Sequence, residues 1–259
     1  SFIISEVARQ LLPLKSFSAS RKMLTRFFAQ PLETYRKVLE VFAQKVVEKL
    51  QDDKIVIILD YTRMPVINLD VLFASLLLEG RAIPIYFEIL FPWMIEKGSQ
   101  NLFEVNLVKK LREILPPYKD IVITWDRGFA KGQVIKRIID IPGVYFVGRI
   151  KKDTTVFLKD KKQIVGKINL KEGEIFSSFS FYGLNYHIPC TLAGYWKKGM
   201  KEPWWIVTNL KEKPSLILEV YRERFWIEEG FKDVKNELKM SKNYFREKTK
   251  EDRFEKFLI

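Results

Sequence analysis

Hydrophobic and polar positions follow a helical period in the first part of the chain and a strand-like pattern after residue 53. Val38, Phe42 and Val46 recur at three- or four-residue spacing, which is the spacing of one buried helix face. Residues 55–59 and 121–125 are continuous apolar runs rich in β-branched side chains, typical of strands that are buried on both faces. The pattern predicts a helical start followed by an α/β arrangement.

The remaining segments alternate in the same way. Strands are predicted over residues 67–78, 82–91, 144–150 and 204–209, and helices over residues 101–115 and 131–139. Short β segments separated by Lys, Asp and Gly turns are predicted over residues 154–158, 163–170, 175–181 and 187–193. A single long helix is predicted from residue 216 to about residue 240, because no proline follows Pro214.

Composition excludes several classes of protein. Hydrophobic residues make up 47% of the 259 residues, which is enough to bury a core and excludes a disordered basic tail. The one cysteine, Cys190, excludes an internal disulfide and favours a reducing cytoplasm. The sequence offers no apolar run of membrane-spanning length, so we expect no membrane segment. His187 and Cys190 are expected to be structural.

The net charge of +13 is unevenly distributed along the chain. Thirteen basic and six acidic residues give residues 149–213 a charge of +7, whereas residues 1–53, 54–148 and 214–259 carry +3, +2 and +1. The +7 segment also contains three tryptophans and several tyrosines. Basic and aromatic residues together suit neutralisation of a nucleic-acid backbone with base stacking, although solvated lysines in turns are the simpler alternative for any one of them.

Two apolar strands are each followed by an aspartate, Asp60 and Asp126. If the strands are parallel neighbours, both carboxylates emerge at the same edge of the sheet, where open α/β sheets bind ligands. The alternative is that each aspartate caps a turn. The Gly128 that follows Asp126 leaves room for a close approach of the backbone.

The long C-terminal helix is predicted to present four polar residues on one face. Tyr221, Arg224, Glu228 and Lys235 fall within an arc of about 60° at about 100° per residue. Glu229 and Asp233 point elsewhere and are left out of the site. The alternative is a solvated, salt-bridged face, since Arg224 and Glu228 form an ordinary i, i+4 pair.

Three carboxylates converging on one edge would suit two divalent metal ions. Hard oxygen ligands hold Mg²⁺, and two such ions support in-line displacement at a phosphodiester by activating the attacking oxygen and stabilising the leaving one. The neighbouring cations would hold phosphates in alignment.

These residues and spacings resemble a known family. Tyr221-x2-Arg224-x3-Glu228-x6-Lys235 has the Y-(2)-R-(3)-E-(6)-K spacing of the IS4-type DDE transposases, and residues 60–62 and 126–129 resemble the first and second catalytic aspartate motifs of that family. The resemblance implies that Asp60, Asp126 and Glu228 are the catalytic metal ligands. It also implies that Tyr221, Arg224 and Lys235 position DNA phosphates.

The resemblance further implies the reaction and its partners. It implies two Mg²⁺ ions, with Mn²⁺ as a substitute, hydrolytic nicking at transposon ends, a hairpin intermediate, and strand transfer into target DNA. A flipped base in the hairpin would need an aromatic support, for which Phe225, Trp226, Trp196, Trp204 and Trp205 are candidates. The partners would be double-stranded DNA and a second copy in a homodimer, in a prokaryotic cytoplasm in association with the nucleoid.

The implied fold is α/β: an RNase H-like mixed sheet with flanking helices. Residues 1–53 form an N-terminal helical segment expected to contact DNA, and residues 54–150 form the first part of the catalytic core. Residues 151–203 form a basic, β-rich insertion before the last catalytic helix, and residues 204–259 complete the core. Two alternatives stay open: a non-catalytic DNA-binding regulator derived from a transposase, and an RNase H-like nuclease without strand transfer.

Overall fold

The computed structural model describes residue 9 and residues 16–64, 69–90, 100–185 and 187–236. The N-terminal part contains two helices, α2 (Phe17–Ala29) and α3 (Leu32–Glu48). The Ser16 side chain caps α2 by accepting from the Ala19 N–H at 3.3 Å. The helical character predicted for this part of the chain is confirmed for the described residues.

The centre of the molecule is one ten-stranded mixed sheet with strand order β3-β2-β1-β4-β5-β10-β9-β8-β6-β7. The strands are β1 (Lys54–Met64), β2 (Leu69–Leu78), β3 (Arg81–Leu90), β4 (Asp120–Trp125), β5 (Val144–Arg149), β6 (Thr155–Leu158), β7 (Lys161–Ile164), β8 (Ile175–Tyr182), β9 (Ile188–Tyr195) and β10 (Trp204–Thr208). Strands β1, β4 and β5 are parallel neighbours, and the remaining pairs are antiparallel. The α/β class and the mixed sheet with flanking helices are as predicted.

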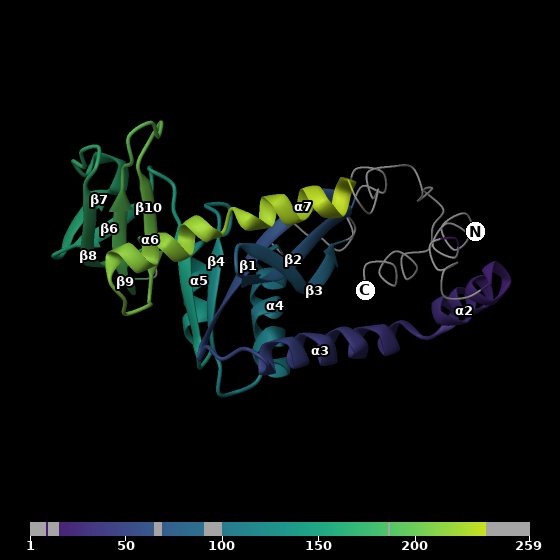
Figure 1. The fold of residues 1–259 in the computed structure, drawn as a ribbon. Helices are drawn as coiled ribbons and strands as arrows, with labels where there is room; N and C mark the ends of the chain where they lie inside the picture. Colours follow the sequence, from purple (N-terminus) through teal and green to yellow (C-terminus); the bar gives the residue numbers. More distant parts are fainter. Residues whose placement is uncertain (1–8, 10–15, 65–68, 91–99, 186, 237–259) are drawn as a thin grey trace.

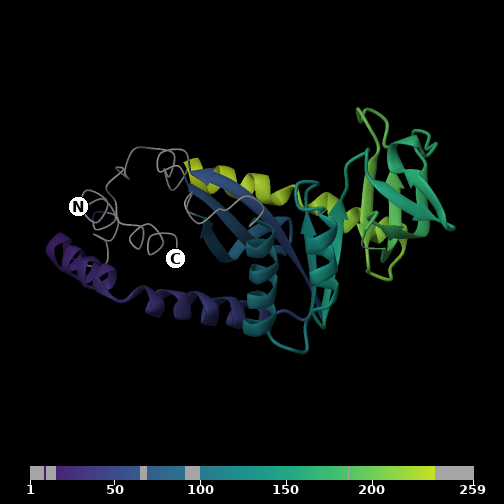
Figure 2. The same cartoon turned by 180° about the vertical axis from the view of Figure 1, so that it is seen from behind.

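Helices cover both faces of the sheet (Figures 1 and 2). On one face, α3, α4 (Gln100–Ile114) and α5 (Gly132–Ile139) bury apolar residues against Ile55, Ile57 and Leu59 of β1. On the other face lie α6 (Pro214–Glu223) and α7 (Trp226–Asn236). Here α6 packs on β4, β5, β8 and β9, and α7 packs on β1 and β3. Alternation along β1 therefore sends odd-numbered side chains to α3–α5 and even-numbered ones to α6 and α7.

Two tryptophans fix the spacing of neighbouring strands. Trp125 in β4 pairs with Gly148 in β5, and Trp205 in β10 pairs with Gly194 in β9. A Cβ at Gly148 would lie 2.5 Å from the indole Nε1 of Trp125, and one at Gly194 would lie 2.5 Å from the ring of Trp205. Both tryptophans are almost fully buried. The glycines are needed here because the rings occupy the volume of a side chain on the next strand.

Three details of the predicted elements are wrong. Strand β1 does not end at Asp60 but continues to Met64, because it pairs with β2 as far as Leu69. The C-terminal helix is not continuous, since it is interrupted at Arg224 and Phe225, between α6 and α7. The segment predicted as a strand over residues 163–170 is the end of β7 followed by a short 3₁₀ helix, Val165–Lys167.

The β-rich segment before the last helices extends the central sheet. Strand β10 pairs with β5 on one side and with β9 on the other, so β6–β9 continue the same hydrogen-bonded ladder. Within it, Cys190 is buried, and burial raises the pKa of its thiol to about 11, as expected of a structural cysteine. The boundaries at residues 53, 150 and 203 stay predictions. No helix in the described ranges is long and apolar enough to span a membrane.

Candidate active site

Asp60 and Asp126 lie side by side at one edge of the sheet. Strands β1 and β4 are parallel, with Leu59 opposite Trp125, so the two aspartates occupy the next position on each strand. Asp60 shares its face of β1 with Ile58, which packs against Ile227 of α7. The predicted convergence of the two aspartates is therefore present, and it faces α6 and α7.

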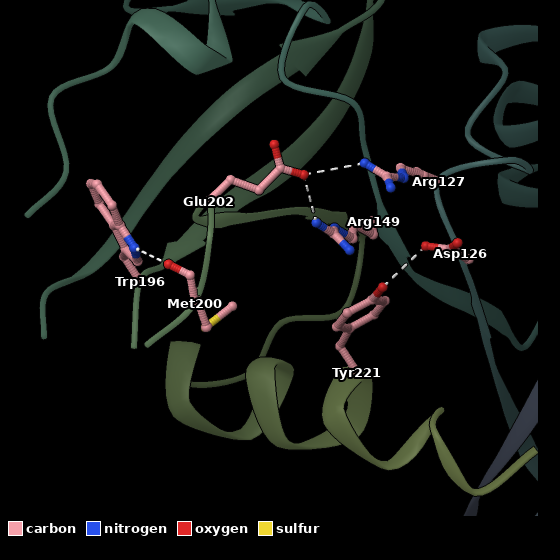
Figure 3. A network of polar contacts seen from close by, with 7 residues as sticks. All are labelled: Asp126, Arg127, Arg149, Trp196, Met200, Glu202 and Tyr221. Atoms are coloured by element: carbon pink, nitrogen blue, oxygen red, sulfur yellow. Dashed lines mark hydrogen bonds and ion pairs between the residues drawn. The ribbon is translucent and has the colours of Figure 1, made fainter. Parts of the chain in front are cut away.

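Tyr221 connects α6 to the second aspartate. Its hydroxyl donates to Oδ1 of Asp126 at 3.4 Å (Figure 3). The tyrosine is fully buried, and burial raises the pKa of its hydroxyl. In this structure Tyr221 orients Asp126, and its contact with a DNA phosphate stays a prediction.

Arg224 connects the first aspartate to the glutamate. Its Nη1 lies 3.5 Å from Oδ2 of Asp60, and its Nη2 donates to Oε1 of Glu228 at 3.2 Å. The arginine side chain is only 6% exposed, while Glu228 is 51% exposed. The break between α6 and α7 falls at this arginine, so the guanidinium bridges the two acids from the joint between the helices.

The acids influence one another. The pKa of Asp60 is raised to about 6, mainly by burial and in smaller part by the charges of Asp126 and Glu228, while Arg224 and the Tyr61 N–H oppose the rise. Asp60 also accepts from the Tyr61 N–H at 2.8 Å. Clustered carboxylates in a partly buried site need a cation for charge balance, and Arg224 supplies part of it here.

The donor set fits Mg²⁺ in chemistry, because all three side chains supply hard oxygen atoms. Among the described residues, however, no three His, Cys, Asp or Glu side chains lie close enough together to hold one ion as they stand. Arg224 lies between Asp60 and Glu228, so the two acids must turn away from the guanidinium to share a cation. Lys235 belongs to α7, and its side chain lies outside the described part of the structure.

A second polar group beside Asp126 was not predicted from the sequence. Arg127 and Arg149 both donate to Oε1 of Glu202, each at 3.2 Å (Figure 3). Arg149 also lies over the Trp204 ring, with 6.0 Å from its Cζ to the ring centroid. Arg149 could have been found from its position at the end of β5, the third parallel strand. Nothing in the sequence marks Glu202 as its partner.

A further acidic group lies on the opposite face of the sheet. Glu104 of α4 accepts from the Tyr61 hydroxyl at 3.3 Å and lies 4.0 Å from Nζ of Lys131. Tyr61 stacks on Phe129, with ring centroids 5.1 Å apart. Burial raises the pKa of Glu104 to about 7. This cluster ties β1 and the segment after Asp126 to α4.

The aromatic residues that are candidates for supporting a flipped base differ in their exposure to solvent. Trp205 is buried, and Trp196 donates to the Met200 carbonyl at 3.1 Å. Phe225 and Trp226 are about 40% exposed. Phe225 stacks on Trp204, with centroids 5.8 Å apart. Trp205 is thus removed from the candidates, and Phe225 with Trp204 lies next to Tyr221.

The comparison with protein families decides the assignment. The family model described as the transposase DDE domain matches residues 97–254, which is more than half of the chain. The chain belongs to the DDE transposase family. The matched residues of this DDE transposase domain include Asp126 and Glu228, while Asp60 precedes them.

A solved structure has the same fold as this DDE transposase domain. It is a piggyBac transposase in a synaptic complex with hairpin DNA, 13% identical in sequence, with a TM-score of 0.51. The likeness covers 77% of this chain and 44% of the piggyBac chain, so this chain spans less than half of that protein. The RNase H-like fold is thereby shown. No curated protein matches the sequence.

Proposed function

We propose that the chain is the catalytic part of an IS4-type transposase that cleaves transposon ends with Mg²⁺ and joins them to target DNA. The observation that carries this proposal is the pairing of Asp60 and Asp126 on adjacent parallel strands, with Glu228 linked to Asp60 through Arg224. The spacing of Tyr221, Arg224, Glu228 and Lys235 supports the IS4-type assignment within the family shown above.

In this proposal each residue has a separate task. Asp60, Asp126 and Glu228 would hold two Mg²⁺ ions, or Mn²⁺ in their place. When bound, such ions lower the pKa of a coordinated water and stabilise the leaving oxygen. Tyr221 fixes the orientation of Asp126 through its hydroxyl. Arg224 holds Asp60 and Glu228 until DNA arrives and then contacts a phosphate, as Lys235 of α7 does.

The attacking groups would be water and then the 3′-hydroxyl of DNA. Water cleaves one strand, and the freed 3′-hydroxyl attacks the opposite strand to give a hairpin, which is opened before strand transfer. No covalent link to the protein is needed. Burial of Tyr221 supports this, because its hydroxyl is turned toward Asp126 and burial raises its pKa, both unfavourable for a nucleophile.

DNA would be held outside the acidic cluster. Residues 149–213 carry +7 of the net charge of +13, and α2 contributes Arg21, Lys22 and Arg26 with no acidic residue in the helix. Two copies would act together on two ends as a homodimer, in a prokaryotic cytoplasm and close to the nucleoid. Phe225 and Trp204 are the proposed support for a flipped base.

The first prediction concerns cleavage. The purified chain is incubated with Mg²⁺ and a duplex carrying the terminal sequences of the element that encodes it, and products are resolved on denaturing gels. We expect a 3′ nick that proceeds to a hairpin, and a loss of at least about 100-fold in rate for Glu228→Gln, since a lost metal ligand removes transition-state stabilisation. Glu229→Gln, on the same helix, is the matched control and should cleave like the wild type.

The alternatives give different products. Tight, salt-sensitive binding without cleavage under Mg²⁺ or Mn²⁺ would support a DNA-binding regulator. Nicking that stops before the hairpin and never yields joined target DNA would support a simple nuclease. Unchanged cleavage by Glu228→Gln would contradict the proposed site.

A further inference from the structure

We propose that Arg127 and Arg149 form a binding site for a DNA backbone phosphate beside the acidic cluster, and that the Glu202 carboxylate occupies this site when DNA is absent. The inference rests on the proposed function and adds a site to it. It also gives the loop between β9 and β10 a role in admitting DNA.

The two arginines come from different elements and converge on one atom. Arg127 directly follows Asp126, and Arg149 ends β5. Each guanidinium donates to the same oxygen, Oε1 of Glu202, at 3.2 Å (Figure 3). Two guanidinium groups directed at one oxygen form a fork that suits an anion with several oxygens, such as a phosphodiester.

The geometry of the site is held by its surroundings. Arg149 is 15% exposed, and its guanidinium lies over Trp204, which itself packs edge-on against Tyr221 with ring centroids 5.1 Å apart. Arg127 is 48% exposed and Glu202 is 36% exposed, so the site is open to solvent on one side. A phosphate can therefore reach the arginines from solvent while they stay beside Asp126.

Glu202 belongs to a loop that is otherwise basic. Residues 196–203 include Lys197, Lys198 and Lys201, all exposed. The loop is folded by the Trp196 indole, which donates to the Met200 carbonyl at 3.1 Å. Because Glu202 is the acid of this loop and contacts both arginines, it holds the loop against the catalytic core with a carboxylate where a phosphate would bind.

The two possible roles of Glu202 predict opposite effects on DNA affinity. If it competes with phosphate, its neutralisation releases both arginines and strengthens binding. If it merely supports the arginines as a structural salt bridge, its neutralisation weakens binding. The sign of the change therefore distinguishes them.

The test is equilibrium binding of the full chain to a blunt-ended duplex of mixed sequence, without divalent ions, across a range of salt concentrations. We expect Glu202→Gln to bind about three- to tenfold more tightly than the wild type. We expect Arg149→Gln and Arg127→Gln to bind more weakly, with the slope of log affinity against log salt reduced by about 1 for each. In the Glu202→Gln background, Arg149→Gln should cost more affinity than in the wild type.

The matched control is Glu212→Gln, which also removes one negative charge and releases one cation, Lys54, at 2.7 Å. Lys54 begins β1, six residues before Asp60 in the strand. This variant should shift affinity less than Glu202→Gln does. Circular dichroism and thermal melting of every variant establish that it is folded, and Arg149→Lys provides a milder change if Arg149→Gln is not.

Weaker or unchanged binding by Glu202→Gln, or an equal gain from Glu212→Gln, would overturn the inference. Its failure is distinguishable from failure of the proposed function, because binding is measured without metal and cleavage is measured separately. If Glu228→Gln abolishes cleavage but Glu202→Gln does not tighten binding, the transposase proposal stands and the phosphate site does not.

Discussion

Arg224 places a buried positive charge between two of the proposed metal ligands. Because an ion pair in a partly buried site leaves an uncompensated charge when one partner is removed, Asp60→Asn acts on folding as well as on chemistry. Glu228 is half exposed, and its substitution leaves Arg224 paired with Asp60. Glu228→Gln is therefore the cleaner test of catalysis.

Glu104 gives a prediction about pH at the scale of a single residue. Its pKa is about 7 in the folded protein, raised by burial from an ordinary value of 4.5. The folded state therefore binds this proton more tightly than the unfolded state does, and the free energy of unfolding falls as pH rises from about 4.5 to about 7. Glu104→Gln lacks this titration. Its free energy of unfolding, relative to that of the wild type, should therefore rise by about 3 kcal/mol between pH 4.5 and pH 7.

Urea denaturation at pH 4.5 and at pH 8 measures this effect. Glu113→Gln, on the same helix but 69% exposed, is the control and should follow the wild type at both pH values. A difference between Glu104→Gln and wild type that stays constant with pH would show that the carboxyl does not titrate as argued.

At the residue scale, the sequence predicted the acids better than their neighbours. Asp60 and Asp126 stand out because each follows a continuous apolar strand. Arg149 and Glu202 do not, because their contact joins the end of β5 to a loop more than fifty residues away in sequence. No local periodicity in the sequence indicates such a contact. Arg127 was visible in the motif, but its partner was not.

At the scale of elements, strand pairing depends on the two tryptophan and glycine pairs. A Cβ at Gly148 would lie 2.5 Å from the Trp125 indole, so Gly148→Ala must displace a buried ring or separate β4 from β5. Overpacking of this kind costs about 1–3 kcal/mol. We expect Gly148→Ala to lower the free energy of unfolding by that amount, as measured by chemical denaturation.

Gly128→Ala is the matched control for this prediction. An added Cβ there meets no atom within 4 Å, so its stability should stay close to that of the wild type. Equal stability of the two variants would mean that the sheet absorbs the extra methyl group without strain.

The strands were predicted well because buried runs and turn residues are local signals. The interruption of the last helix was not predicted, because Arg224 and Phe225 are both compatible with a helix. The cause lies in the tertiary contacts: α6 packs on β5, β8 and β9, whereas α7 packs on β1 and β3. The chain must change direction between these two surfaces, and it does so at Arg224.

At the scale of the whole molecule, the strands of the basic segment and the strands next to Asp60 and Asp126 lie in different parts of the sheet. The basic segment forms strands β6–β9 at one end of the sheet, beyond β10 (Figure 1). That these strands continue the central sheet was not predicted from the sequence. Hydrophobic and polar residues alternate only partly in this segment, and no local sequence pattern indicates the order of strands in space. The RNase H-like order of the first strands was anticipated through the family resemblance.

The location of charge leads to a prediction for DNA affinity. Replacing Lys197, Lys198 and Lys201 together with glutamine should weaken binding to duplex DNA and reduce the salt slope by about 2 to 3, since each phosphate contact contributes about 1. A triple variant of Lys109, Lys110 and Lys136, which lie on α4 and α5, makes the same change of charge on the other side of the sheet. Equal losses from both variants would indicate a response to net charge alone.

The interruption at Arg224 and Phe225 divides the proposed site residues between two helices that pack on different strands. Tyr221 belongs to α6, which packs on β4, β5, β8 and β9, whereas Glu228 belongs to α7, which packs on β1 and β3. Tyr221, which contacts Asp126, and Glu228 therefore lie on opposite sides of one joint in the chain, and the residue at that joint is the arginine that pairs with two of the acids.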